Sequence, residues 1–186
     1  LISFSTKIFA DETEFQIEGM SLGDSLLDYY SEKEIKKAKA KVEKSWSYKD
    51  KTYTPLSFHK KLKTYNSVQV NYKTQDDDFT IESVSGSRTY KKNIEDCYKK
   101  QDEIVDELTG FFEDAEKLGY GTYEHFYDKS GETTIKGVSF IFKSGAEVLI
   151  QCTDWSKKFT RKKKWHDELR ISIDTKEFLD FLDYAY

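Results

Sequence analysis

The sequence has little proline and little arginine. Pro55 is the single proline among 186 residues, and the only arginines are Arg88, Arg161 and Arg170. Because the guanidinium group binds carboxylates and phosphates through two parallel hydrogen bonds, which lysine cannot form, few such clamps are available. The formal net charge of −4 also argues against a nucleic-acid-binding protein, which is normally basic. We expect no nucleic-acid partner.

Long hydrophobic runs are also lacking. No stretch approaches the roughly 18 apolar residues of a membrane-spanning helix, so we expect no transmembrane segment. Hydrophobic residues make up only 37% of the chain, but aromatic residues reach 16%. Aromatic side chains bury large areas, and disordered chains are poor in them. The composition therefore predicts a folded protein with an aromatic-rich core.

Recognisable catalytic and metal-binding motifs are absent. His59, His125 and His166 have no spacing that would bring two of them onto one metal ion. The segment 85–87 is no nucleophile elbow, and 119–121 lacks the third glycine and the Lys-Ser/Thr of a phosphate-binding loop. We expect no metal and no cofactor.

Cysteine is scarce and even in number. Cys97 and Cys152 lie far apart, outside any Cys-x-x-Cys motif and without histidine at metal-binding spacing. The apolar pattern places Cys97 on the buried face of a helix and Cys152 on the inward face of a strand. These positions predict a disulfide, with two independent buried thiols as the alternative.

Residues 1–10 are similar to the tail of a secretory signal peptide. An apolar stub is followed by small polar residues, then Ile8 and Ala10 at the −3 and −1 positions of a cleavage site, with Asp11 next. A disulfide fits the same compartment, because disulfides persist in oxidising environments. We expect a periplasmic or secreted protein; the alternative for residues 1–10 is an N-terminal strand or a disordered end.

The second half begins with a long amphipathic helix, predicted over about 93–118. Apolar residues recur there at intervals of three and four, and Gly119 stands at the position of a C-terminal cap. Alternation then predicts strands, a tight turn at 143–145, and a final helix capped at 174–177. The strands are expected near 121–128, 133–143, 146–154 and 166–173.

The first half has a less regular pattern. It predicts a short strand at 14–18, a short helix capped by Asp24, and a lysine-rich helix after a capping box at 31–34. A hairpin follows at 68–81, and Pro55 favours an edge strand in the 46–62 stretch.

Helices followed by strands thus occur twice, at 11–90 and 91–186. This order predicts an α+β fold, in which the long helix and the C-terminal helix pack on one face of antiparallel strands. The strands could form one continuous sheet or two adjoining ones. The division into 11–90 and 91–186 is compatible with a single domain.

Two segments are candidates for a functional surface. The first concentrates positive charge beside aromatic rings and is expected to be an exposed loop that contacts an anionic envelope surface or a protein partner. The second is a group of tyrosines that could form an aromatic surface for a sugar or peptide, or simply pack in the strands. The candidate loop residues are Lys157, Lys158, Arg161, Lys162, Lys163, Lys164 and Trp165, and the tyrosines are Tyr120, Tyr123 and Tyr127.

Two stretches carry a resemblance to known proteins. IEGMSLGDSLLDYY at 17–30 and CYKKQDEI at 97–104 resemble uncharacterised small exported proteins of marine alphaproteobacteria. The turn at 19–25 is also similar to the entry of BamE/SmpA-type outer-membrane-assembly lipoproteins, although the lipid-bearing cysteine of that family is absent. The first resemblance implies export and no particular activity.

These observations favour an exported, non-enzymatic interaction or ligand-binding protein. The alternative is an envelope hydrolase whose catalytic residues meet only in three dimensions. A histidine, a carboxylate and a serine or tyrosine in one concave pocket would favour that alternative.

Overall fold

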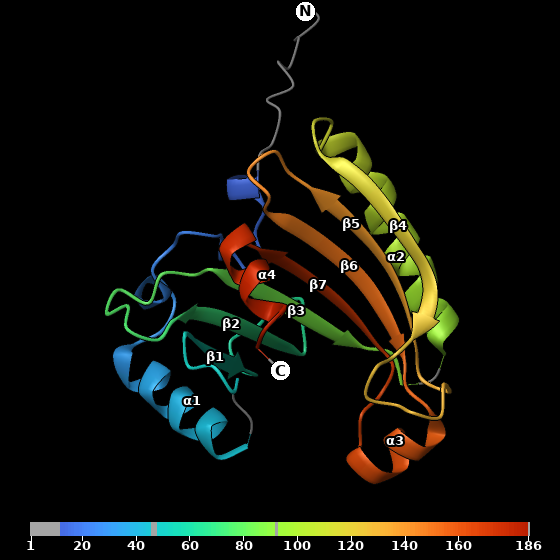
Figure 1. Ribbon diagram of the computed structural model, residues 1–186, viewed down its shortest axis with the longest axis horizontal. Helices are drawn as coiled ribbons and strands as arrows, with labels where there is room; N and C mark the ends of the chain where they lie inside the picture. The colour runs from blue at the N-terminus through green and yellow to red at the C-terminus, as the bar shows by residue number, and fades with distance from the viewer. Residues whose placement is uncertain (1–11, 46–47, 92, 186) are drawn as a thin grey trace, which may run out of the picture.

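The computed structural model describes residues 12–45, 48–91 and 93–185 (Figure 1). The proposed signal-peptide remnant at 1–10 lies outside the described residues. Within them, none of the helices is both long and apolar enough to cross a membrane.

All the named strands join in one seven-stranded antiparallel sheet with the order β1-β2-β3-β7-β6-β5-β4. Two meanders, β1 to β3 and β4 to β7, meet where β3 pairs with β7. The two halves of the sequence therefore share one continuous sheet. The strands are β1 (Tyr53–Phe58), β2 (Ser67–Lys73), β3 (Ser83–Thr89), β4 (Glu116–Glu124), β5 (Thr134–Ile141), β6 (Glu147–Asp154) and β7 (Glu168–Asp174).

One face of the sheet carries the main hydrophobic core. Alternation along β6 directs Val148, Ile150 and Cys152 to this face, and all three are fully buried. Helix α1 (Glu32–Ser45) packs beside β1, and α2 (Ile94–Phe111) packs against β6 and β7. The core joins the apolar side chains of both helices to those of the strands.

Helix α2 is shorter than the predicted 93–118. Asn93 caps its N-terminus, but the helix ends at Phe111, and Glu116–Glu124 form β4. Phe112, only 3% exposed, packs against Phe140 and Phe142 and turns the chain toward the sheet. Apolar spacing alone continues past this point, so it could not show where the helix ends. Gly119 lies in β4 and is no helix cap.

The C-terminal helix α4 (Lys176–Leu182) packs on the face opposite α2, so the expectation that both share one face is wrong (Figure 1). Phe178 of α4 contacts Tyr48 and Tyr53 in a small separate cluster. The predicted cap is confirmed: Thr175 Oγ1 accepts a hydrogen bond from Phe178 N.

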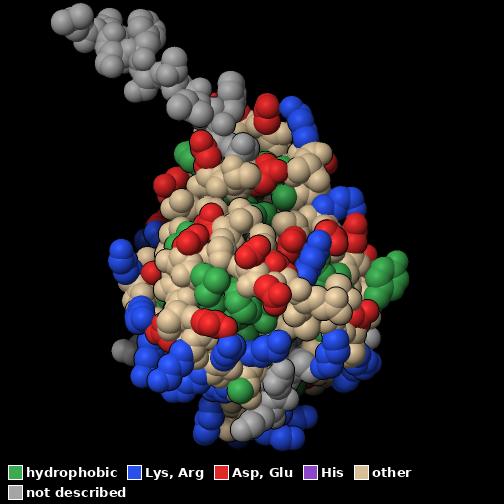
Figure 2. All heavy atoms as spheres, turned by 90° about the vertical axis from the view of Figure 1, so that its left-hand side faces the viewer, with side chains coloured by type: hydrophobic (Ala, Val, Ile, Leu, Met, Phe, Trp, Pro, Cys, Tyr) green, Lys and Arg blue, Asp and Glu red, His purple; other side chains and the backbone are tan. Residues whose placement is uncertain are grey.

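In the first half, the capping box before α1 is confirmed by reciprocal hydrogen bonds between Ser31 and Glu34. Pro55 lies on the edge strand β1, as predicted. Figure 2, which looks from the left of Figure 1, shows Lys and Arg side chains gathered over the lower part of that side, where α1 lies.

Three details of the first half differ from prediction. The 14–18 segment forms only an isolated bridge between Ile17 and Met20. Ser25, in place of Asp24, caps the short 3-10 helix η2 (Leu26–Asp28). The second strand of the hairpin begins at Ser83, because the amide of Ile81 instead donates a hydrogen bond to the N-terminal segment.

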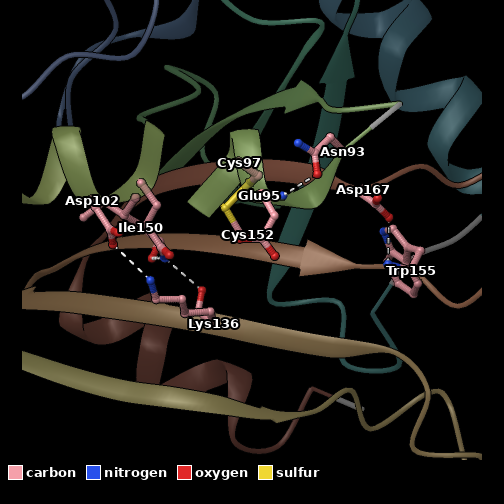
Figure 3. The surroundings of a disulfide bond; sticks show 10 residues. Asn93, Glu95, Cys97, Asp102, Lys136, Ile150, Cys152, Trp155 and Asp167 are labelled. Atoms are coloured by element: carbon pink, nitrogen blue, oxygen red, sulfur yellow. Dashed lines mark hydrogen bonds and ion pairs between the residues drawn. A yellow bond between two sulfur atoms is a disulfide. The ribbon is translucent and has the colours of Figure 1, made fainter. Parts of the chain in front are cut away.

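The predicted disulfide is confirmed. Cys97 of α2 and Cys152 of β6 are bonded, with their Cα atoms 6.1 Å apart and both side chains fully buried (Figure 3). Beside it, Gln101 Nε2 donates to the carbonyl oxygens of Lys136 and Ile150, at 2.8 and 2.9 Å. The disulfide and these two hydrogen bonds attach α2 to the second meander.

Candidate functional site

The face of the sheet opposite α2 carries small polar side chains beside apolar and aromatic ones. Register places Ser85 of β3, Ser172 of β7, Leu149 of β6 and Ser139 of β5 side by side in one row across four strands. The short serine side chains of this row leave space above the strands. The outcome is a hollow of about 950 Å³, which we call the groove. It is lined by Tyr48, Gln69, Asn71, Tyr123, His125, Phe126, Tyr127, Ile135, Glu147, Leu149, Gln151, Phe159, Lys163, Trp165, Arg170, Ser172, Asp174, Phe178, Leu179 and Leu182.

One end of the groove is formed by the basic segment, which is a short helix instead of the predicted exposed loop. Helix α3 spans Lys157–Lys163. Ser156 caps its N-terminus, and Lys164 ends it in the left-handed conformation with φ 59°. The aromatic and lysine residues of so short a stretch show no clear apolar repeat, so periodicity does not predict a helix there. The basic side chains of this segment are all exposed.

Aromatic rings from distant segments meet at this end. Trp155, before α3, lies 4.6 Å from Trp165, after it, measured between ring centroids. His125, after β4, lies 4.7 Å from Trp155, and Phe126 and Tyr127 stack beside His125. We call this cluster, together with the basic residues of the α3 segment, the basic–aromatic surface. It comprises Lys157, Lys158, Arg161, Lys162, Lys163, Lys164, Trp155, Phe159, Trp165, His125, Phe126 and Tyr127.

The structure thus joins parts of the two sequence candidates. Tyr127 and the lysines of α3 line one hollow. Residues 127–130 form one side of it, and Lys158, Lys162 and Lys163 form the other. Tyr123 lines the groove beside them, and Tyr120 lies over Gly137 on the same face of the sheet. These tyrosines are 43–49% exposed, so they are not core residues.

Asp128 holds the two segments of the basic–aromatic surface together. Its carboxylate accepts hydrogen bonds from Ser130 and from Thr133 Oγ1, and Thr133 Oγ1 in turn accepts one from Ser156 N at the start of α3. These hydrogen bonds favour the ionised form and hold the pKa of Asp128 below its usual range. These hydrogen bonds connect the segment after β4 to the start of α3.

At the other end of the groove, near α4, two carboxylates lie on neighbouring strands. Asp174 of β7 and Glu147 of β6 are direct cross-strand partners. Ser172 Oγ donates to Asp174 at 2.7 Å, and Ser139 Oγ donates to Glu147. Burial raises the pKa of Asp174, and the nearby Glu147 raises it further.

We expect Asp174→Asn to stabilise the protein at neutral pH, because it removes a buried charge and keeps an acceptor for Ser172. The pKa of Asp174 in the folded protein lies above its value of about 3.9 in the unfolded chain. The destabilisation caused by the buried charge is therefore absent below about pH 3.9 and grows as the pH rises through the folded-state pKa. Urea titrations should show an advantage over wild type at pH 7 that shrinks toward pH 4. Asp106→Asn, at an exposed site on α2, is the control. An equal gain from that control, or a constant gain across pH, would refute this account.

No family model, curated protein or solved structure matches the chain. Within the described ranges, no group of three or more His, Cys, Asp and Glu side chains is placed to hold a metal ion.

The groove does not bring a histidine to the carboxylate pair. The backbone amide of His125 donates a hydrogen bond to the carbonyl oxygen of Thr133, which places His125 near Asp154 at the C-terminal end of β6. Asp174 pairs with Glu147 at the opposite end of β6. The two ends of β6 are seven residue steps apart, a span of about 23 Å. The arrangement that would favour the hydrolase alternative is therefore not formed by His125 and Asp174.

Sequence reasoning missed the floor of the groove. Its signal was serine alternating with apolar residues, as in 83–86 and 171–173. This alternation predicts strands with one polar face, but it does not show that the polar faces of several strands adjoin.

Proposed function

We propose that this is an exported, non-enzymatic binding protein that takes an anionic ligand at the basic–aromatic surface. One observation carries the proposal: two segments separated in sequence, one aromatic and one basic, form a single surface at one end of the groove. Export is supported by the disulfide, because such bonds are rare in reducing compartments.

The charges of the α3 segment lack compensation. In the described part of the chain, no carboxylate lies within 4.0 Å of any basic group of residues 157–164. Elsewhere many lysines are paired, as in Lys36–Glu32 and Lys136–Asp102. Uncompensated positive charge on a protein of net charge −4 creates a local field that attracts anions.

The aromatic rings add a second mode of contact. Lys163 Nζ lies 6.0 Å from the centroid of Trp165, whose side chain is 39% exposed. An exposed ring next to cationic groups offers apolar contact and charge to the same ligand. Anionic cell-envelope polymers and lipid head groups carry both the negative charge and the apolar groups that such a surface can contact.

We expect the triple charge reversal Lys162→Glu, Lys163→Glu and Lys164→Glu to weaken binding to an anionic polymer by about 100-fold. Each lysine near an anionic surface contributes about 1 kcal/mol, so losing three attractions has an effect of this size. Dextran sulfate and phosphatidylglycerol vesicles are suitable probes, assayed by fluorescence titration and co-sedimentation.

The matched control reverses Lys33, Lys36 and Lys37 on α1, with the same change of net charge. Circular dichroism should show that both triple variants are folded. If the control loses as much binding as the α3 variant, net charge alone is responsible and the α3 surface is not the site. Unchanged binding by the α3 variant to both probes would contradict the proposal outright.

A further inference from the structure

Arg170 lies in the middle of the groove floor. It belongs to β7, where it pairs with Ser87 on one side and Gln151 on the other, and Gln151 pairs with Gly137. In the described part of the chain no carboxylate lies within 4.0 Å of its guanidinium, although Glu168 and Asp174, on the same face, feel its charge. A half-buried guanidinium with no ion-pair partner is available to receive a carboxylate through two hydrogen bonds.

Amide side chains lie on the same floor. Gln69 and Gln151 line the groove, and neither side chain has a hydrogen-bond partner among the described residues. Each amide offers both donors and an acceptor. Such groups suit a ligand that carries many hydroxyls, each of which both donates and accepts.

The wall of the groove supplies aromatic faces. Tyr123 and Trp165 both line it and are 43% and 39% exposed. A pyranose ring has one face made of C–H groups and hydroxyls around its rim. It can therefore lie on an aromatic ring while its hydroxyls meet the amides of the floor.

A peptide fits the groove less well. A sheet captures an extended peptide by pairing main chains at a free edge. The floor strands β2, β7, β6 and β5 are internal, and β4, which contributes Tyr123, is the one edge strand that lines the groove. Because the main-chain groups of the internal strands are used in the sheet, the floor offers a ligand side chains only.

We infer that the groove binds an acidic oligosaccharide, with a uronate carboxylate on Arg170, hydroxyls on Gln69 and Gln151, and a sugar ring against Tyr123 or Trp165. This inference rests on the proposed binding function and names its ligand class. The basic–aromatic surface lies at one end of the groove and extends the positive field along a polyanionic chain.

Isothermal titration with oligogalacturonate, oligomannuronate and a hyaluronan oligosaccharide tests the ligand class. We expect the wild-type protein to bind at least one of these oligosaccharides. The methyl ester of that oligosaccharide keeps the sugar rings and removes the charge, so it should bind about 10- to 100-fold more weakly. Arg170→Gln should weaken binding of the free acid by a similar factor. Arg170→Lys should recover only part of the loss, because lysine lacks the two-pronged geometry.

Arg88→Gln is the matched control, since Arg88 is exposed and its strand position directs it to the opposite face. Wild type binding acid and ester equally, or Arg170→Gln binding like wild type, would overturn the inference. Tighter binding of oligoglutamate than of any uronate would assign the groove to acidic peptides instead.

The two proposals fail separately. If wild type binds dextran sulfate through α3 but none of the uronates, the oligosaccharide inference is wrong and the proposed function stands. If it binds neither polyanion nor uronate, both are wrong. The acid–ester comparison uses wild type alone, so it holds even if an Arg170 variant does not fold.

Discussion

Replacing Cys97 and Cys152 together by alanine should lower the free energy of unfolding by about 4 kcal/mol. The bond closes a loop with a sequence separation of 55 residues, and loss of its constraint on the unfolded chain accounts for this figure in the chain-entropy treatment. Domains of this kind are stable by only about 5–15 kcal/mol. For a chain of this size, the midpoint of thermal unfolding should fall by about 8–16 °C.

Thermal and urea denaturation of the double variant, compared with oxidised and reduced wild type, measure this effect. Reduced wild type should resemble the double variant, because both lack the cross-link and differ only in two buried sulfur atoms. A double variant as stable as oxidised wild type would show that packing of α2 on β6 is sufficient without the bond.

Gly86→Ala should destabilise the protein by about 1–3 kcal/mol through overpacking. A Cβ atom at Gly86 would lie 2.6 Å from Cγ and Cδ1 of Tyr65, whose ring lies over this glycine. Atoms cannot approach so closely, so the ring or the strand must shift. Urea denaturation at neutral pH measures the loss.

Gly137→Ala is the internal control for this prediction. It is also a glycine within a strand, but a Cβ there would lie 3.5 Å from Tyr120 and 3.7 Å from Leu149, which are ordinary contacts. We expect its effect to stay within about 1 kcal/mol. The double variant Gly86→Ala with Tyr65→Ala should cost less than the sum of the two single changes, since removing the ring removes the clash. Equal effects of the two glycine changes would refute the close-packing argument.

Both predictions bear on the site. Cys152 lies on β6, whose other face lines the groove, and Gly86 lies on β3, which pairs with the groove strand β7. A shift in either strand would move Gln151 or Ser85 relative to Arg170. The core face is therefore expected to set the geometry of the binding face.

The disulfide was predictable because it depends on two local patterns. A helical repeat buries Cys97 and strand alternation buries Cys152, so each can be placed inside before the fold is known. The end of α2 was not predictable in this way. Phe112 continues the apolar spacing of the helix, and only its contacts with Phe140 and Phe142 show why the chain turns there.

The basic segment and the tyrosines were identified as candidates from composition, but their association was not. Lys158 and Tyr127 are separated by a hairpin, and the link through Asp128, Thr133 and Ser156 forms only when β5 and β6 pair. The sequence also gave no reason to connect Arg170 with either of them.

The sequence by itself determined the secondary-structure class, the buried cysteines, the capping box, the edge proline and the two chemically distinctive segments. These follow from short-range periodicity and from the preferences of single residues, which act within a few positions along the chain. The tertiary structure alone decided that β7 inserts between β3 and β6, and therefore which polar residues adjoin. A groove is made of side chains from several strands, so its composition depends on the order of the strands. Packing over the whole core sets that order, and no local sequence pattern predicts it.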